Sequence, residues 1–401
     1  MSVLPAWAHW NPVAAEAPWT VGIEEEVMLL DPSDWALASR IEDVLPALSG
    51  RVAGCARAET HGSAIELAGR AHATVAAAAT ELAALRAALV VDLAPLGLRA
   101  AVAGMHPFVL WSDVEVSPGA RHQAIHDSMR ELARREPTFA LHVHVAVPDA
   151  EAAVRALRAL RVHVPLLLAL SANSPFWQGR DTGLASARVP IFNAFPRVGI
   201  PRAFGSYAEY VQAIDMLLRC GAVPEPTFLW WDVRLQPKLG TIEVRIFDAQ
   251  TRSGDDAALA ALVQSVVRLE ATEDSPAATT AGHPEVLDEN RFLAARDGLD
   301  AELIDPDGHG RRPAREVLDQ LLDACAPHAA ALDCESELAA VAELADDPGH
   351  RRQRTLAGGL GEDAVGLAFG TLLSAMAADF VTSSRPTQVG VATTAPVAWG
   401  G

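Results

Sequence analysis

Four segments of the chain alternate hydrophobic and polar residues with the period of two that is typical of β-strands. They cover residues 19–30, roughly 58–67, 139–147 and 241–248. Because successive side chains of a strand point to opposite faces, each segment predicts a strand with one apolar and one polar face. Such strands fit a sheet that packs its apolar face on the protein core.

Helical spacing of Ala and Leu dominates the longer segments between and after these strands. The helices that it predicts cover 73–94, Asp149 (as N-cap) to about Leu160, Ser206 to Gly221, 255–272, and two or three segments between 313 and 380. Strands separated by long helical inserts, without regular βαβ alternation, favour an α+β fold with a mainly antiparallel sheet.

The polar faces of these strands carry acids and imidazoles. Glu24 and Glu26 share one face of the first strand, whereas Glu25 lies on the other face with Val and Ile. In "FALHVHVAVPD", His142 and His144 point away from an apolar face of Leu and Val. The sequence therefore predicts paired functional groups on one side of the sheet.

Two further segments add acids and a guanidinium. In "GTIEVRIFDAQT", Glu243 and Arg245 lie opposite the apolar face of Ile242, Val244 and Ile246. The segment "AETHGSAIELAG" carries Glu59 and Glu66, and the glycine between them predicts a turn or a bulge.

For any one of these strands alone, a solvated outer face is the usual explanation. The combination is more specific, because Glu and His are the ligands that suit Mg²⁺ or Mn²⁺. Divalent ions would also compensate carboxylates placed in a strand that is otherwise apolar. Taken together, the four segments predict a metal-lined site.

Arginines near this site indicate a second kind of chemistry. Arg245 shares a face with Glu243, and Arg234 in "WWDVRLQP" precedes it. A guanidinium beside metal-bound carboxylates can clamp a phosphate or a carboxylate, which suggests phosphoryl transfer. The sequence contains no P-loop and no Rossmann glycine motif, so a nucleotide would have to bind in another way.

The segment "LSANSPFWQGRDTGLASAR" is rich in glycine and small polar residues. It is either an ordinary connection or a substrate-ordering loop with the candidate contacts Asn173, Ser174, Asp181, Thr182 and Arg188. In "ENRFLAARDG", Arg291 and Arg296 lie on a predicted helix, as part of a solvated face or as anion contacts.

Composition limits the partners. Fifty-one acids against 32 basic residues give a formal charge of -19, which argues against a nucleic-acid duplex or an anionic membrane as partner. The four cysteines show no CxxC pair, the N-terminus has no signal-peptide pattern, and the apolar segment 75–91 is too polar for a membrane span. We therefore expect a cytoplasmic protein with small-molecule partners, which forms either a monomer or a homo-oligomer.

Five motifs together resemble the type 2 glutamate–cysteine ligase family of carboxylate–amine ligases. They are "TVGIEEEVMLLDP", "HVHVAVPD", "LLALSANSPFWQGRDTGLASAR", "GTIEVRIFDAQT" and "ENRFLAARDGLDA", and they cover residues 19 to 300 in the order of the family. The resemblance implies a glutamine synthetase-like fold, in which an antiparallel sheet forms the floor of a funnel-shaped active site and helices pack behind it. Residues 1–383 would form one catalytic domain with a helical C-terminal part at 313–383, and 384–401 a loose tail.

The resemblance also implies residue roles. Glu24, Glu26, Glu66, His142 and Glu243 resemble the metal ligands, His144 lies nearer the phosphates, and Arg245 stabilises the transferred phosphoryl group. Arg234 joins Arg245 and His144 as a candidate catalytic residue, and Arg296 joins the candidate substrate contacts. The cofactors implied are ATP and Mg²⁺, with Mn²⁺ as an alternative.

The implied reaction activates the side-chain carboxylate of glutamate as an acyl phosphate, which the amine of cysteine or another acceptor attacks. Ala146, Phe247 and Leu235 depart from the family pattern and leave the acceptor amine open. Two alternatives remain: a guanidino kinase-like phosphotransferase on the same scaffold, and a non-catalytic nucleotide-binding protein.

Overall fold

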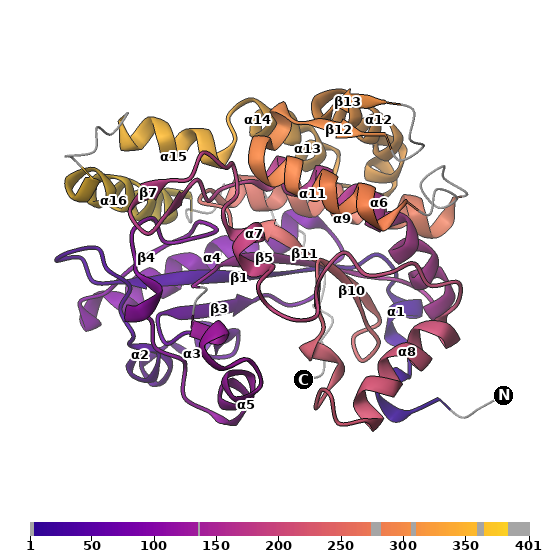
Figure 1. Ribbon diagram of the computed structural model, residues 1–401, viewed down its shortest axis with the longest axis horizontal. Helices are drawn as coiled ribbons and strands as arrows, with labels where there is room; N and C mark the ends of the chain where they lie inside the picture. Colours follow the sequence, from indigo (N-terminus) through magenta and orange to yellow (C-terminus); the bar gives the residue numbers. More distant parts are fainter. Residues whose placement is uncertain (1–3, 135–136, 274–281, 306–309, 359–364, 384–401) are drawn as a thin grey trace.

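One antiparallel sheet of seven strands organises the protein (Figure 1). The computed structural model describes residues 4–134, 137–273, 282–305, 310–358 and 365–383, so the predicted tail at 384–401 lies outside the described residues. The strands follow the order β10-β11-β5-β1-β3-β2, and β4 pairs with the end of β1. Their bounds are β1 (Val21–Leu30), β2 (Ala56–Ala58), β3 (Ala64–Ala68), β4 (Arg99–Ala101), β5 (Ala140–Ala146), β10 (Val233–Gln236) and β11 (Thr241–Asp248).

Helices of very different length surround this sheet. The described helices are α1 (Val13–Glu16), α2 (Ile41–Ala47), α3 (Gly50–Ala53), α4 (Val75–Leu93), α5 (Ala120–Met129), α6 (Ala150–Ser171), α7 (Arg188–Phe192), α8 (Tyr207–Arg219), α9 (Ser253–Thr272), α11 (Pro284–Asp297), α12 (Ala314–Leu332), α13 (Glu335–Ala339), α14 (Val341–Asp346), α15 (Gly349–Ala357) and α16 (Val365–Ser383). Three two-stranded pairs complete the structure: β6 (Phe176–Trp177) with β7 (Arg180–Asp181), β8 (Val198–Gly199) with β9 (Trp230–Trp231), and β12 (Glu302–Ile304) with β13 (Arg311–Pro313).

The expected α+β fold with a mainly antiparallel sheet and helices behind it is confirmed. Helices α4, α6 and α9 pack on the apolar face of the sheet, and α11, α12 and α13 pack on them as an outer layer (Figure 1). The apolar strand residues are fully buried there, as alternation predicts, because Ile23, Val143 and Val244 are at most 1% exposed. Each of the described helices is too short or too polar for a membrane span.

Several predicted boundaries change in the structure. The helix that begins after Asp149 runs to Ser171 rather than to Leu160, and Pro165 lies inside it. The segment around 58–67 is a hairpin of β2 and β3, with the glycine in its turn. Among the described residues of 314–383 there are five helices rather than two or three, and the short helices α13 and α14 follow each other without a glycine or proline between them.

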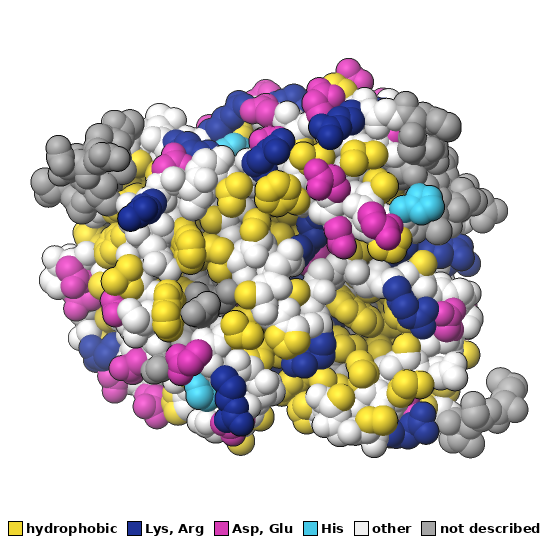
Figure 2. Space-filling view, in the orientation of Figure 1, with side chains coloured by type: hydrophobic (Ala, Val, Ile, Leu, Met, Phe, Trp, Pro, Cys, Tyr) yellow, Lys and Arg dark blue, Asp and Glu magenta, His cyan; other side chains and the backbone are white. Residues whose placement is uncertain are grey.

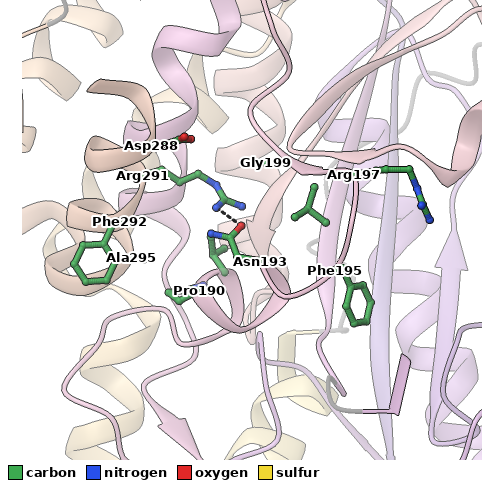
Figure 3. A pocket seen from close by; sticks show the side chains of 11 residues that line it. Pro190, Asn193, Phe195, Arg197, Gly199, Asp288, Arg291, Phe292 and Ala295 are labelled. Atoms are coloured by element: carbon green, nitrogen blue, oxygen red, sulfur yellow. Dashed lines mark hydrogen bonds between the residues drawn. The ribbon is translucent and has the colours of Figure 1, made fainter. Parts of the chain in front are cut away.

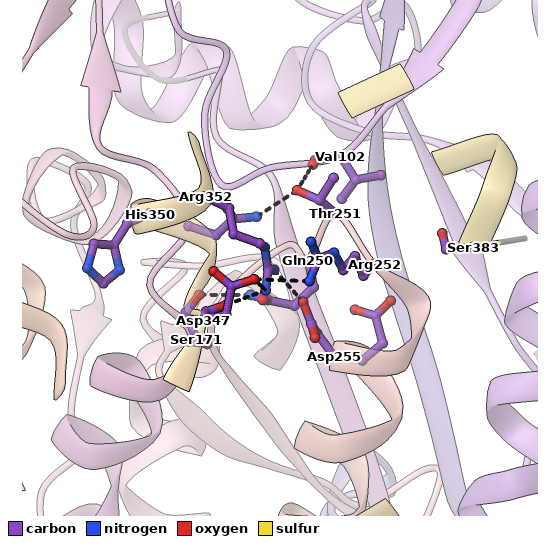
Figure 4. A network of polar contacts seen from close by, with 12 residues as sticks. Val102, Ser171, Gln250, Thr251, Arg252, Asp255, Asp347, His350, Arg352 and Ser383 are labelled. Carbon is purple, nitrogen blue, oxygen red and sulfur yellow. Dashed lines mark hydrogen bonds and ion pairs between the residues drawn. The ribbon is translucent and has the colours of Figure 1, made fainter. Parts of the chain in front are cut away.

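Charged side chains tie the C-terminal helices to the start of α9 (Figure 4). Arg352 of α15 contacts Asp255 of α9 and the backbone oxygen of Asp347, and Arg252 donates to Asp347 at 3.2 Å. In the same helix, the Nε2 of Gln353 donates to the backbone oxygen of Asn173 at 2.7 Å. Helix α15 therefore holds the beginning of the predicted substrate loop in place.

Candidate active site

The sheet register brings the five predicted metal ligands together on its polar face. Glu24 of β1 pairs directly with His142 of β5, and Glu26 pairs with Glu66 of β3. On the other side of β5, Glu243 of β11 pairs with His144. Directly paired residues of antiparallel strands point to the same face with their Cβ atoms about 5 Å apart, so pairing alone makes these groups neighbours.

These residues form two overlapping groups with metal-ligand spacing. One ligand atom from each of Glu24, His142 and Glu243 lies within 4.8 Å of the other two, and the same holds for Glu26, Glu66 and His142. The buried Nε2 atoms of His142 and His144 make no hydrogen bond to the described residues. Carboxylate oxygens together with the His142 imidazole fit divalent cations such as Mg²⁺ or Mn²⁺.

Two of the carboxyls resist ionisation without a cation. Burial, followed by the Glu59 carboxylate, raises the pKa of Glu26 to about 8. Burial, followed by the Glu24 carboxylate, raises the pKa of Glu66 well above its ordinary value. Since like charges crowd a buried space, the described residues alone leave this end of the site short of positive charge.

The other carboxyl on β1 already has positive neighbours. Burial disfavours its charge, but His144 and then His142 outweigh burial and hold the pKa of Glu24 well below its ordinary value. Burial and then Arg245 lower the pKa of His142 to about 4, so its ring is neutral and offers a lone pair. His144 differs, because the carboxylates of Glu24 and Glu243 overcome burial and raise its pKa.

Glu243 is the most heavily compensated acid of the site. Arg234 reaches it with two donors, Nε at 2.7 Å and Nη2 at 3.1 Å, and the Nε2 of Gln236 donates at 2.6 Å. Arg245 is the third residue that contacts Glu243. Burial opposes ionisation, yet Arg234 and then Arg245 hold the pKa of Glu243 well below its ordinary value. Both oxygens of Glu243 are therefore engaged before any metal arrives.

The two candidate catalytic arginines have different surroundings. Arg234 uses Nη1 on the backbone oxygens of Thr227 and Leu229, at 2.9 and 3.0 Å, so all its nitrogens are occupied and it positions Glu243. Arg245 also contacts Nδ1 of His142 at 3.3 Å and is partly exposed. Arg245 is thus the one of the pair with donors free for a ligand.

The start of the predicted substrate loop is organised by an acid that sequence reasoning missed. Asp248 accepts hydrogen bonds from the backbone nitrogen of Asn173 at 2.8 Å, from Ser174 Oγ at 2.6 Å and from Ser186 Oγ at 3.0 Å. Asn173 also donates from Nδ2 to the oxygen of Ala249 at 2.8 Å. Asn173 and Ser174 therefore shape the loop through internal bonds.

Arg188 joins the end of the loop to strand β11, and its positive charge has little compensation from nearby carboxylates. Its Nη1 donates to the backbone oxygen of Ile246 at 3.1 Å, and the nearest carboxylate oxygen, on Asp248, is 3.8 Å away. Its buried Nε has no hydrogen-bond partner among the described residues, and burial lowers its pKa. A buried guanidinium with unused donors beside Arg245 is suited to an anionic group of a substrate.

Three candidate substrate contacts lie elsewhere. Asp181, in the β6–β7 hairpin, forms an ion pair with Arg354 of α15 at 2.7 Å. Thr182 donates to the backbone oxygen of Pro175 at 2.8 Å and stabilises a turn. Arg296 is exposed and pairs with its neighbour Asp297. In the structure these three residues stabilise loop and helix ends rather than the metal-ligand groups.

A β-bulge explains why strand alternation did not predict Asp248 on the polar face of the sheet. Pairing of β11 with β5 shifts between Val244 and Phe247, so Phe247 lies opposite Leu141 on the core face. Asp248 then lies opposite Ala140, on the face that carries His142. An extra residue in one strand inverts the faces beyond it, and uninterrupted alternation cannot show this.

A cavity of about 460 Å³ opens beside this site, between α7, β8 and α11 (Figure 3). Figure 2 shows the surface recessed below α11, where basic and acidic side chains meet. A narrow gap of about 10 Å³ shares Val189 and Arg291 with the cavity and is lined by Arg188 and Arg245. The cavity therefore borders the residues next to Arg188 and Arg245, but a gap of this volume holds about one water molecule.

Comparison with solved structures identifies the fold. The chain superposes on a glutamate–cysteine ligase of Francisella tularensis in complex with AMP, with a TM-score of 0.62 and 13% identity over 91% of this chain and 92% of that one. A bifunctional glutathione synthetase of Pasteurella multocida gives a TM-score of 0.68 at 12% identity, over 92% of this chain and 53% of that one. At such low identity these matches establish the fold, which is that of glutamate–cysteine ligases.

Sequence comparison then gives the family. Residues 20–363 match glutamate–cysteine ligase family 2. A protein of Rubrobacter xylanophilus named "Putative glutamate--cysteine ligase 2-3" is 43% identical over 344 residues, which cover 85% of this chain and 93% of that protein. A Sorangium cellulosum protein named "Putative glutamate--cysteine ligase 2" is 37% identical over 77% of this chain and 83% of its own length. The chain belongs to glutamate–cysteine ligase family 2, which confirms the resemblance and the expected enzyme class, an ATP-dependent ligase that forms C–N bonds.

Proposed function

We propose that this protein uses ATP to activate a carboxylate as an acyl phosphate and then joins it to an amine. The observation that carries the proposal is the convergence of Glu24, Glu26, Glu66 and His142 with Arg245 on one face of the sheet. This arrangement supplies the positions for charge neutralisation around a phosphoryl group, which is most of what phosphoryl transfer requires.

Divalent cations complete the proposed site. The residues that would hold them are Glu24, His142 and Glu243 in one group and Glu26, Glu66 and His142 in the other. When bound, Mg²⁺ would neutralise the ATP phosphates and align them with the carboxylate. The high pKa values of Glu26 and Glu66 support a cation at their end of the site, and the engaged oxygens of Glu243 make it the weakest of the five ligands.

The arginines and His144 would handle the anions. Arg245, which contacts both Glu243 and His142, would offset charge on the transferred phosphoryl group. Arg188 would hold the substrate carboxylate with its unused donors. His144, whose pKa is raised, would carry a proton next to the phosphates rather than bind a metal. Arg234 would act through Glu243 by fixing its position.

The proposed reaction has two steps. A carboxylate oxygen of the acid attacks the γ-phosphorus of ATP, the bond to ADP breaks, and an acyl phosphate forms. The amine nitrogen of the acceptor then attacks the carbonyl carbon and the C–O bond to phosphate breaks. Of the two protons that the ammonium form loses, one leaves with hydrogen phosphate and one passes to the medium.

For the substrates we propose glutamate as the acid and an amine such as cysteine as the acceptor. The names of the similar proteins from Rubrobacter and Sorangium support this pair. A cytoplasmic setting belongs to the same proposal, and it is supported by four cysteines that form no disulfide.

The decisive experiment measures ADP release by the full chain with ATP and Mg²⁺, glutamate, and a panel of amines, together with the mass of each product. Release that needs both the acid and an amine, with an amide as product, supports a ligase. Adding hydroxylamine should trap the acyl phosphate as a hydroxamate. Release with a guanidino compound alone would show a phosphotransferase, and no ADP release with any acid would contradict the proposal.

A further inference from the structure

Arg291 of α11 belongs to a motif whose role the sequence left open, as part of a solvated face or as an anion contact. The structure shows a third arrangement, because Arg291 is only 4% exposed and faces the carboxylate of Asp232. Its Nε lies 2.7 Å from Oδ2 of Asp232, and its Nη2 donates to Oδ1 at 3.0 Å. The remaining nitrogen, Nη1, donates to Oδ1 of Asn193 at 2.6 Å (Figure 3). All three nitrogens of the guanidinium are therefore engaged by the protein itself.

Asp232 lies between β9 and β10 and links this ion pair to the sheet. It is 5% exposed, and its backbone nitrogen donates to the oxygen of Gly199 in β8 at 3.0 Å. Its backbone oxygen accepts a hydrogen bond from the backbone nitrogen of Arg245 at 2.8 Å. A two-pronged contact between a guanidinium and a carboxylate fixes direction as well as distance. The ion pair with α11 therefore fixes the residue to which the backbone of Arg245 is bonded.

Arg245 depends on such a contact because it lies in the β-bulge of β11. Pairing with β5 shifts at this point, so the ladder does not hold Arg245 and Ile246 in register. Their backbone groups bond elsewhere, the nitrogen of Arg245 to Asp232 and the oxygen of Ile246 to Nη1 of Arg188 at 3.1 Å. Contacts from outside the β5–β11 ladder therefore set the position of the bulge.

The side chain on this part of the backbone reaches the metal-ligand groups. Arg245 contacts Glu243 and also Nδ1 of His142 at 3.3 Å. Its guanidinium is several bonds away from Cα, so a small rotation of the bulge moves the charged end further than the backbone. A misplacement of about 1 Å can cost about 100-fold in rate. The position of Arg245 in the active site thus depends on Asp232.

We infer that Arg291 and Asp232 are positioning residues for phosphoryl transfer, which act through the backbone of Arg245 and touch no substrate themselves. The inference rests on the proposed function, in which Arg245 offsets charge on the transferred phosphoryl group. A simple structural tie between α11 and the sheet would stabilise the fold equally well. The test therefore has to measure turnover and coupling to Arg245 as well as stability.

Asp232→Asn removes the charge of the pair and keeps the shape of the side chain. We expect kcat of ADP release to fall about tenfold, and the KM of ATP and of glutamate to change less than about twofold, because the guanidinium of Arg245 acts on the transferred group. The assay contains ATP, Mg²⁺, glutamate and the best amine of the panel, and kcat is scaled to the folded fraction measured by circular dichroism. Arg291→Lys keeps the charge but not the fork, so it should lower kcat in the same direction, and it carries the test if Asp232→Asn does not fold.

Glu25→Gln is the matched control for Asp232→Asn. It also turns a buried acid paired with an arginine into an amide, because Glu25 accepts a hydrogen bond from Arg86 Nε at 2.8 Å on the core face of the sheet. Its kcat should change only mildly at a similar loss of stability. A kcat of Asp232→Asn equal to that of Glu25→Gln would overturn the inference.

Combination with Arg245→Lys separates positioning from a general structural effect. If Asp232 acts through Arg245, Asp232→Asn should lower kcat less than about twofold once residue 245 is already lysine. A loss of about tenfold in either background would show that the two residues act independently, and it would refute the inference.

Hydrogen exchange followed by mass spectrometry tests the contact without turnover. The exchange rate of the β11 peptide that contains Arg245 is divided by that of the β5 peptide, so that a global loss of stability cancels. We expect this ratio to rise in Asp232→Asn and to stay unchanged in Glu25→Gln. A raised ratio, with no ADP release even by the unmodified protein, would support the positioning contact and refute the ligase. An unchanged ratio, with ADP release by the unmodified protein, would leave the ligase standing and overturn the inference.

Discussion

Glu24 and Glu26 occupy neighbouring outward positions of β1, yet their surroundings shift their pKa values in opposite directions. Glu24 lies between two imidazoles, whereas Glu26 lies near other acids and accepts a hydrogen bond from the backbone nitrogen of Ala140 at 2.7 Å. One acid is thus charged before a cation binds, and the other becomes a good ligand only when a cation is present. The two acids of this strand therefore differ in how much their charge depends on a bound cation.

Replacing either acid by glutamine should abolish Mg²⁺-dependent ATP turnover. Because glutamine keeps the shape but not the charge, we expect at least an approximately 100-fold loss of kcat in Glu24→Gln and in Glu26→Gln, with the fold retained. The measurements are ADP release and far-ultraviolet circular dichroism. Glu42→Gln, at an exposed position of α2, serves as the control. Full activity in both single variants would refute the site.

Arg245 should not tolerate the other common basic residue. An ammonium cannot reproduce the planar fork that contacts Glu243 and His142 and offers further donors to a phosphoryl group. We expect Arg245→Lys to lower kcat about 100-fold. Steady-state kinetics of ADP release checks this, and near wild-type turnover would make the arginine structural.

Glu25 has a structural role that its sequence position did not reveal. It lies on the core face, as alternation predicts, and there it accepts a hydrogen bond from Arg86 Nε at 2.8 Å. Arg86 also contacts Asp256 at 2.7 Å, and all three side chains are fully buried. The core thus contains an ion-pair network directly behind the metal-ligand groups.

Glu25→Gln should therefore affect stability more than catalysis. Because breaking a buried ion pair leaves a charge poorly compensated, the free energy of unfolding should fall by about 3–5 kcal/mol. Urea unfolding measures this loss, and kcat of the folded protein should change only mildly. A loss of turnover equal to that of Glu24→Gln, at unchanged stability, would mean that Glu25 faces the active site.

At the scale of elements, the N-terminus of α15 packs directly against the loop that follows α6. A Cβ atom added at Gly349 would lie 2.2 Å from Oδ1 of Asn173, so no side chain fits there without movement. Asn173 in turn bonds to Asp248, which organises Ser174 and Ser186. A change in α15 should therefore reach the loop that carries Arg188.

Gly349→Ala tests this coupling. Overpacking of this contact should lower stability by about 1–3 kcal/mol and raise the KM of the acid substrate. The matched control is Gly254→Ala in the first turn of α9, where an added Cβ meets nothing within 4 Å. There the substitution should be neutral or stabilising by up to about 1 kcal/mol. Thermal unfolding measures the stability of both variants, and steady-state kinetics at varied acid concentration measures their KM. An unchanged KM in Gly349→Ala would show that α15 does not control the loop.

At the scale of the whole molecule, the excess of acid in the site links stability to pH and to metal. The pKa of Glu26 is raised from 4.5 to about 8, and that of Glu66 is also raised, so both bind protons more tightly in the folded state. The free energy of unfolding of the metal-free protein should therefore fall as the pH rises from about 4.5 to about 8.

Mg²⁺ should reverse this loss, because it binds the ionised carboxylates of the folded protein only. We expect the increase in Tm upon addition of Mg²⁺ to be larger at pH 8 than at pH 6, where protons compete with the cation. Thermal unfolding with EDTA or with Mg²⁺ at the two pH values measures it. The same scan of Glu26→Gln should show a smaller increase at pH 8, and an increase independent of pH would contradict the linkage.

Strand periodicity predicted much of the site because a sheet fixes its faces locally. Alternation placed Glu24, Glu26, His142 and His144 on one face, and pairing of β1 with β5 then made them neighbours. It failed beyond Arg245, where the bulge in β11 moves Asp248 to the polar face. A bulge depends on how two strands meet, so neither strand carries the information alone.

The fold class, the polar face of the sheet and the side chains on that face can be predicted from the sequence, because periods of 2 and 3.6 residues are properties of a single segment. The use of those side chains depends on contacts between elements. The tertiary structure brought Arg234 from β10 onto Glu243, Arg86 from α4 onto Glu25, and the ends of α7 and α11 around one cavity. These contacts join residues that are far apart in the chain or on different strands. Which residues meet is set by how the elements pack and by the need to compensate buried charges.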